Sequence, residues 1–312
     1  MGDKVVYGPV PSRRLGRSLG VDLVPYKVCS YDCIYCQIGR TPVPTIKRQP
    51  YVSADKVVDD VLESFEQKVS PDYITLGGSG EPTLNSNIRE IIERVKKATT
   101  VPVTVLTNGS MLMFPEVRAD LKYADVVLPS FDACRPEMFQ RINRPCPEIE
   151  FEKMADGMVQ FRKEYPGQIW MEIFLVEGVN TADEDIEQFR SWMDQIRPDK
   201  IHLNTAVRPT AESDVSRPAD ATLIRVRDRL GDRAEIVVPY QGEGAGSRGS
   251  ALRDDLIRLL SRRPCTLADI ASGLNTHSHE VLKYLEPLVN SGDVEIVRKN
   301  GEAYYQGKHS GS

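Results

Sequence analysis

The chain has 312 residues, of which 40% are apolar and 27% charged, and its formal net charge is −5. These values are typical of a soluble globular protein with one barrel-sized domain and a small second one. No apolar run approaches the ~20 residues that span a bilayer, and no apolar segment of a secretory signal opens the chain. The negative charge gives no overall attraction to nucleic acid or to anionic membranes.

Strand and helix patterns alternate through the middle of the chain. Repeated units with short apolar strands predict a parallel sheet, and six units predict an α/β fold built as a partial (β/α)6 barrel. The predicted strands are 19–24, 72–76, 102–106, 125–128, 169–176 and 200–205, and the main helices are 53–69, 86–98, 150–164 and 183–196.

A second, smaller domain follows. Residues 1–240 form the predicted barrel, the Gly/Ser-rich segment 241–250 is a predicted linker, and 251–308 shows three helical segments followed by a hairpin. That order predicts a winged-helix-like domain. From residue 250 onward there are eight Lys or Arg and eight Asp or Glu, so this domain is formally neutral and lacks the net positive charge of a typical nucleic-acid-binding domain. We therefore favour a protein-docking module or a lid over a nucleic-acid-binding domain.

Three of the six cysteines, Cys29, Cys33 and Cys36, lie close together after the first predicted strand. Three thiolates can hold three irons of an iron–sulfur cluster and leave the fourth iron open, whereas a closed cluster takes four. Zinc is the alternative, but it prefers four Cys or His ligands and no histidine is near. The pattern favours a cluster with an open site, in a protein of the reducing cytoplasm.

The cysteines, with Tyr35 before the last of them, resemble the cluster motif of the radical S-adenosylmethionine (SAM) superfamily. Residues 77–83 resemble its glycine-rich motif, and residues 6–208, including 8–16, resemble the wyosine-synthase-like branch. The resemblance implies a [4Fe-4S] cluster, SAM, and reductive cleavage of SAM to a 5′-deoxyadenosyl radical that abstracts hydrogen from a substrate. It also implies an electron donor such as flavodoxin or ferredoxin.

Motif residues fall at the carboxyl ends of the predicted strands, where β/α barrels carry their catalytic groups. On the resemblance we expect the methionine part of SAM to meet the glycine motif, the ribose to meet Ser130 and Asp132, and adenine to pack on Val179. Each of these residues has an ordinary alternative as a turn or helix cap. The expected cofactor-binding residues are Tyr35, Gly78, Ser79, Gly80, Glu81, Asn108, Ser130, Asp132 and Val179.

Arginines line the same predicted mouth. Arg13 and Arg14 precede the first strand, Arg144 follows the fourth unit and Arg208 ends the sixth. The guanidinium fork suits carboxylate and phosphate, although a scattered arginine is usually a solvated surface charge. We therefore expect an anionic or nucleotide-like substrate.

The substrate class stays open between an RNA base, a peptide and an anionic metabolite, because no second cysteine set or flavodoxin-like segment accompanies the branch resemblance. Cys134 and Cys146 lie near the mouth, where packing and hydrogen donation are both open roles. The alternative function is an iron–sulfur redox sensor that binds an operator through the winged helix.

Overall fold

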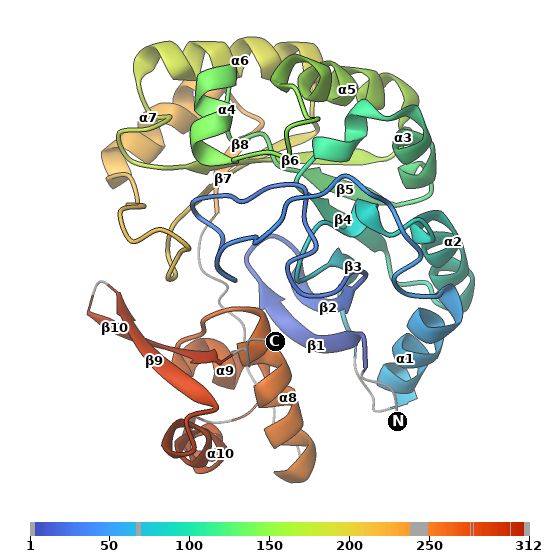
Figure 1. The fold of residues 1–312 in the computed structure, drawn as a ribbon, viewed down its shortest axis with the longest axis vertical. Helices are drawn as coiled ribbons and strands as arrows, with labels where there is room; N and C mark the ends of the chain where they lie inside the picture. The colour runs from blue at the N-terminus through green and yellow to red at the C-terminus, as the bar shows by residue number, and fades with distance from the viewer. Residues whose placement is uncertain are drawn as a thin grey trace.

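The computed structural model describes residues 4–66, 70–237, 249–274, 276, 278–299 and 301–308. An eight-stranded sheet curves around the molecule with helices on its outer side (Figure 1). Its strands are β1 (Val6–Ser12), β2 (Gly16–Asp22), β3 (Tyr73–Gly77), β4 (Val103–Thr107), β5 (Val126–Pro129), β6 (Gln168–Leu175), β7 (Lys200–Thr205) and β8 (Ala234–Ile236). The helices of this part are α1 (Ala54–Glu66), α2 (Ile88–Ala98), α3 (Pro115–Leu121), α4 (Pro136–Ile142), α5 (Phe151–Glu164), α6 (Asp183–Ile196) and α7 (Asp220–Leu230).

The strands lie in chain order, with β2 to β8 parallel and β1 antiparallel to β2. The six predicted strands correspond to β2–β7, which confirms the mostly parallel α/β sheet. Two strands were missed. β1 contains Pro9 and Pro11 and has a register shift between Tyr7 and Val10, features of an edge strand that weaken the sequence pattern. β8 has only three residues.

The predicted helices agree within a few residues at each end. α1 begins after Ser53, whose hydroxyl accepts a hydrogen bond from the backbone N–H of Lys56 at 3.3 Å, as expected of an N-cap. Residues 67–69 of the predicted helix lie outside the described residues.

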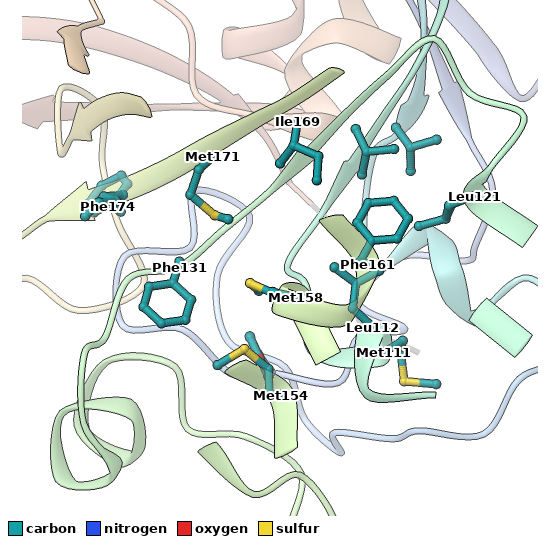
Figure 2. Packing of buried hydrophobic residues seen from close by; sticks show 14 of the residues in the cluster. Met111, Leu112, Leu121, Phe131, Met154, Met158, Phe161, Ile169, Met171 and Phe174 are labelled. Carbon is teal, nitrogen blue, oxygen red and sulfur yellow. The ribbon is translucent and has the colours of Figure 1, made fainter. Parts of the chain in front are cut away.

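The main core lies between the sheet and its outer helices and is rich in methionine. Met154 and Met158 on α5 point toward Phe131 and toward Met171 on β6 (Figure 2). Gly109, at the turn after β4, has φ +78, and a Cβ there would collide with the Met158 side chain. Because the end of the Met158 side chain is flexible and can move, the positive φ is what requires glycine in this turn.

A smaller core belongs to the C-terminal part, which contains α8 (Gly249–Arg262), α9 (Leu267–Gly273), α10 (Ser278–Asn290) and the antiparallel pair β9 (Val294–Lys299) and β10 (Glu302–Gly307). Val10 of β1 is buried in this second core together with Leu256 and Leu260. Figure 1 shows these elements beside β1. The helix–hairpin order is as expected, while the winged-helix assignment stays a prediction.

Polar contacts join the two parts. The Arg262 guanidinium pairs with Asp22 at the end of β2 and lies 4.1 Å over the ring of Tyr7. The Tyr304 hydroxyl donates to the carbonyl of Val207, in the loop after β7, at 2.7 Å. Of the predicted linker, residues 241–248 lie outside the described residues, and 249–250 already belong to α8.

In the part of the chain that the structure describes, no helix has both the length and the apolar character needed to cross a membrane.

We expect Val10→Ala to lower the free energy of unfolding by about 1–3 kcal/mol, because it leaves a void in the C-terminal core. Urea denaturation of the cluster-free protein measures this. Val43→Ala is the matched control, because the Val43 side chain is 77% exposed and its loss should change little. Equal effects of the two substitutions would contradict the shared core.

Candidate functional site

The three clustered cysteines lie in the long loop that joins β2 to α1, at the carboxyl end of the sheet. All three thiols are half-buried. Burial raises the pKa of Cys29 to about 12, with a further contribution from the nearby Glu81 carboxylate, and burial raises that of Cys33 well above its usual range. Thiolates in this setting need a compensating metal charge, which is what iron would supply.

Each thiol contacts one nitrogen donor from a different part of the chain. Asn108 Nδ2 lies 3.5 Å from Cys29 Sγ, Asn143 Nδ2 lies 3.5 Å from Cys33 Sγ, and Lys27 Nζ lies 3.3 Å from Cys36 Sγ. Donors aimed at sulfur stabilise negative charge on it, so the environment fits a cluster held by thiolates.

Across the described residues, no three His, Cys, Asp or Glu side chains are arranged to hold a single metal ion. In a [4Fe-4S] cluster each thiolate binds a different iron, so the three sulfurs need not converge on one point.

The glycine motif after β3 packs directly against the segment that precedes Cys29. The Ser79 carbonyl accepts a hydrogen bond from the N–H of Lys27 at 2.7 Å, and the Glu81 N–H donates to the Val28 carbonyl at 2.9 Å. A Cβ at Gly78 would collide with the Asp22 carboxylate, and one at Gly80 with the Val28 carbonyl. The glycines therefore permit a close approach between this motif and the cysteine loop.

Glu81 is buried, and both of its carboxylate oxygens accept hydrogen bonds within the protein. Oε1 accepts from the N–H of Thr83 at 3.0 Å and from the Thr107 hydroxyl at 2.7 Å, and Oε2 accepts from the N–H of Asn108 at 2.7 Å. Burial raises the pKa of Glu81. This carboxylate ties the loop after β3 to the loop after β4 and so positions Asn108 beside Cys29.

Asp132, at the end of the β5 unit, organises a second buried network. Its carboxylate accepts from the Tyr35 hydroxyl, from Asn143 Nδ2 at 3.0 Å and from the N–H of Phe174 at 2.8 Å. The Tyr35 ring stacks on Phe174 with centroids 4.0 Å apart. Asp132 therefore fixes the orientation of two residues that border Cys33 and Cys36.

Ser130 is half-buried beside this network, and its backbone bridges to Glu172 of β6. Val179 packs against the main core in the turn after β6. That turn is held by Asn180, whose amide donates to the carbonyls of Asp132 at 2.9 Å and Phe174 at 2.8 Å. Ser130 and Val179 thus lie near Asp132, and their expected contacts with ribose and adenine stay predictions.

The four predicted substrate arginines differ in their partners. Arg14 pairs with Glu172 inside the barrel, and Arg208 Nη2 lies 3.3 Å from Asp269 of α9. Arg144 pairs with Glu212 at 2.6 Å, on the side of the cysteine loop. Arg13 forms no hydrogen bond or ion pair with any residue that the structure describes.

Two contributors, Lys27 and Asn143, were not predicted from the sequence, and Asn180 was expected only as a turn or helix-cap residue. Their roles come from contacts across the fold, and only Lys27 had a local signal, its place two residues before Cys29. Cys134 and Cys146 are buried, and their Sγ atoms lie 3.8 Å from Met138 Sδ and 2.8 Å from Glu148 Oε2.

Burial raises the pKa of Asp132 to about 6, so its protonation favours the folded state. This stabilisation is fully present below the unfolded pKa of about 4 and is lost as the pH rises through 6. Relative to Asp132→Asn, we expect the wild-type free energy of unfolding to fall by about 3 kcal/mol between pH 4 and pH 7 in urea denaturation of the cluster-free protein. The exposed control Asp59→Asn should follow the wild type, and a parallel curve for Asp132→Asn would contradict the assignment.

The chain resembles several known proteins. It is 37% identical over 305 residues to a protein named GTPase Obg from Brachyspira hyodysenteriae, a match that covers 97% of this chain but 45% of that protein. It is 29% identical over 314 residues to a UPF0026 protein of Methanocaldococcus jannaschii, covering 96% of this chain and 95% of the relative. A UPF0026 protein of Synechocystis is 36% identical over 205 residues, covering 65% of this chain and 76% of the relative.

Solved structures share the fold. TYW1 with a lysine-pyruvate adduct bound matches with a TM-score of 0.51 and 15% identity, covering 94% of this chain and 82% of that one. SuiB of Streptococcus suis bound to S-adenosylmethionine matches with a TM-score of 0.51 and 13% identity, covering 72% of this chain and 50% of that one.

The Radical SAM superfamily profile matches residues 23–193, which contain the cysteine loop and the glycine motif. The chain therefore belongs to the radical SAM superfamily, whose enzymes use a [4Fe-4S] cluster and S-adenosylmethionine.

Proposed function

We propose that Cys29, Cys33 and Cys36 hold a [4Fe-4S] cluster, and that the enzyme cleaves SAM reductively to a 5′-deoxyadenosyl radical and abstracts hydrogen from an anionic substrate. The observation that carries this proposal is the set of three half-buried thiols, each with its own nitrogen donor, packed against the glycine motif. Superfamily membership supports the cofactors.

The residues around the thiols divide into proposed contacts and positioning groups. We assign Gly78, Ser79 and Gly80 to the methionine end of SAM, because backbone groups are accessible where side chains are absent or small. Ser130 is the proposed ribose contact and Val179 the proposed adenine contact.

Glu81 and Asp132 take positioning roles in this proposal, because their carboxylate oxygens already accept hydrogen bonds from Thr83, Asn108 and Phe174. The groups they orient are Asn108, which lies beside Cys29, and Tyr35, which belongs to the cysteine loop itself.

An external one-electron donor such as flavodoxin or ferredoxin is part of the proposal, because the superfamily requires a reductant. For the substrate, an anionic metabolite fits the arginines of the barrel, and an RNA base is the alternative that the wyosine-synthase-like resemblance of the sequence implies.

The direct test is product formation. Anaerobically reconstituted protein, given SAM and dithionite, should release 5′-deoxyadenosine, and Cys33→Ala should abolish both the cluster absorbance and the product. Cys134→Ala is the matched control and should retain both, because Cys134 is packed in the main core, with its Sγ 3.8 Å from Met138 Sδ. An intact cluster without any 5′-deoxyadenosine would contradict the proposed activity.

Lys27 offers a second test. Its ammonium lies 3.3 Å from Cys36 Sγ, and a positive charge there stabilises the more negative, reduced cluster. Lys27→Met should therefore lower the cluster midpoint potential by roughly 60 mV, the equivalent of about 1.4 kcal/mol for one electron, in an EPR-monitored redox titration. The exposed Lys47→Met in the same loop should leave the potential unchanged, and an unshifted potential in Lys27→Met would refute the role.

A further inference from the structure

The loop after β7 meets the C-terminal domain along a polar seam. Lys299 Nζ of β9 lies 3.2 Å from the Arg208 carbonyl, and the Tyr304 hydroxyl of β10 donates to the Val207 carbonyl. Arg208 in turn faces Asp269 of α9. The hairpin and α9 therefore hold one wall of the barrel mouth in place.

Positive charge gathers at this seam. Arg208 lies 3.3 Å from Asp269 of α9, Arg263 directly follows α8, and Arg13 lies in the turn after β1, the strand whose Val10 packs in the C-terminal core. These three residues are here called the seam arginines, and the charges of Arg208 and Arg263 both act on the ionisation of Arg13. Burial, followed by the charges of Arg208, Arg14 and Arg263, lowers the pKa of Arg13 to about 10.

Three carboxylates lie near these charges: Glu172, Asp269 and Glu302, whose Oε2 lies 2.9 Å from the Tyr304 hydroxyl. Glu172 pairs with Arg14, and Asp269 lies against Arg208 while also accepting from the N–H of Thr266. The guanidinium groups of Arg13 and Arg263 have neither an ion pair nor a hydrogen bond within the described ranges. Among the residues that the structure describes, Arg13 and Arg263 therefore lack a counterion.

Arg208 adds an independent sign of a missing ligand. Its side chain is only 9% exposed, and its Nε–H is buried with no acceptor among the described residues. A buried donor without a partner destabilises the folded chain, and a bound oxyanion would supply the missing acceptor. The guanidinium fork matches both carboxylate and phosphate oxygens.

We propose that the seam arginines form a subsite for the oxyanion of the substrate, a carboxylate or a phosphate, and that the C-terminal domain supplies part of it through Arg263. This inference rests on the proposed function and names the substrate handle. The seam adjoins the barrel interior, because Arg14 follows Arg13 and pairs with Glu172, which bridges to Ser130. A substrate held here would reach toward the residues assigned to SAM.

The C-terminal domain then acts as a wall of the substrate site. Its hairpin already contacts the barrel through Lys299 and Tyr304, so it is engaged within the chain.

Binding can be measured without turnover. Isothermal titration calorimetry on the anaerobically reconstituted whole chain, at constant ionic strength, would use inorganic phosphate in one arm and malonate in the other. We expect saturable binding of at least one anion. The anion that binds more tightly shows whether the substrate carries a phosphate or a carboxylate group. Arg13→Gln and Arg263→Gln should each weaken it about tenfold or more, since each removes a charged donor.

Arg13 and Arg263 are suitable positions because neither side chain makes a polar contact with the described residues that its loss would break. Arg13→Lys keeps the charge and should retain binding within a few fold. The exposed Arg17→Gln, in the same β1–β2 hairpin region, is the matched control and should bind as the wild type does.

No binding of either anion by the wild type, or equal weakening by Arg17→Gln and Arg13→Gln, would overturn the subsite. Binding of an RNA oligonucleotide without binding of phosphate or malonate would also overturn it in favour of a polynucleotide surface. SAM cleavage without substrate reports the proposed function separately, so loss of anion binding with 5′-deoxyadenosine still formed would refute only the subsite.

Discussion

The cysteine site depends on contacts made between loops that follow different strands. The thiols come from the loop after β2, but their nitrogen donors include Asn108 after β4 and Asn143 after α4. A half-buried thiolate without such donors and without metal charge is unfavourable. The site can therefore exist only when the parallel sheet has brought these carboxyl ends together.

Two buried carboxylates hold that assembly. Glu81 joins the loops after β3 and β4, and Asp132 joins the β5 loop to Tyr35 and β6. Both lie at the carboxyl edge where the sequence predicted cofactor contacts. Their oxygens accept hydrogen bonds from neighbouring N–H and hydroxyl groups. We therefore propose that they orient the residues that contact the cofactor. A buried carboxylate satisfied by several donors is a rigid anchor, which suits that task.

Features that depend on neighbouring residues in the chain could be predicted from the sequence. Features that depend on contacts between distant parts of the chain could not. The spacing of Cys29, Cys33 and Cys36, the apolar strands and the glycine motif are local patterns, and they predicted the sheet and its functional edge. β1 was not predicted because its two prolines weaken the strand pattern, and β8 was not predicted because it has only three residues. Asn143 and Arg263 carry no local signal, because their partners are distant in the chain. The occupied oxygens of Glu81 and Asp132 were equally invisible for that reason.

We propose an iron site that is held by three cysteines and open to SAM. Mössbauer spectroscopy of protein reconstituted anaerobically with ⁵⁷Fe, recorded before and after addition of SAM, tests it most directly. We expect a [4Fe-4S] signal in which the isomer shift and quadrupole splitting of one iron change on SAM binding while those of the other three do not. A cluster whose four irons are unaffected by SAM, or a protein that takes up zinc and no cluster, would contradict it.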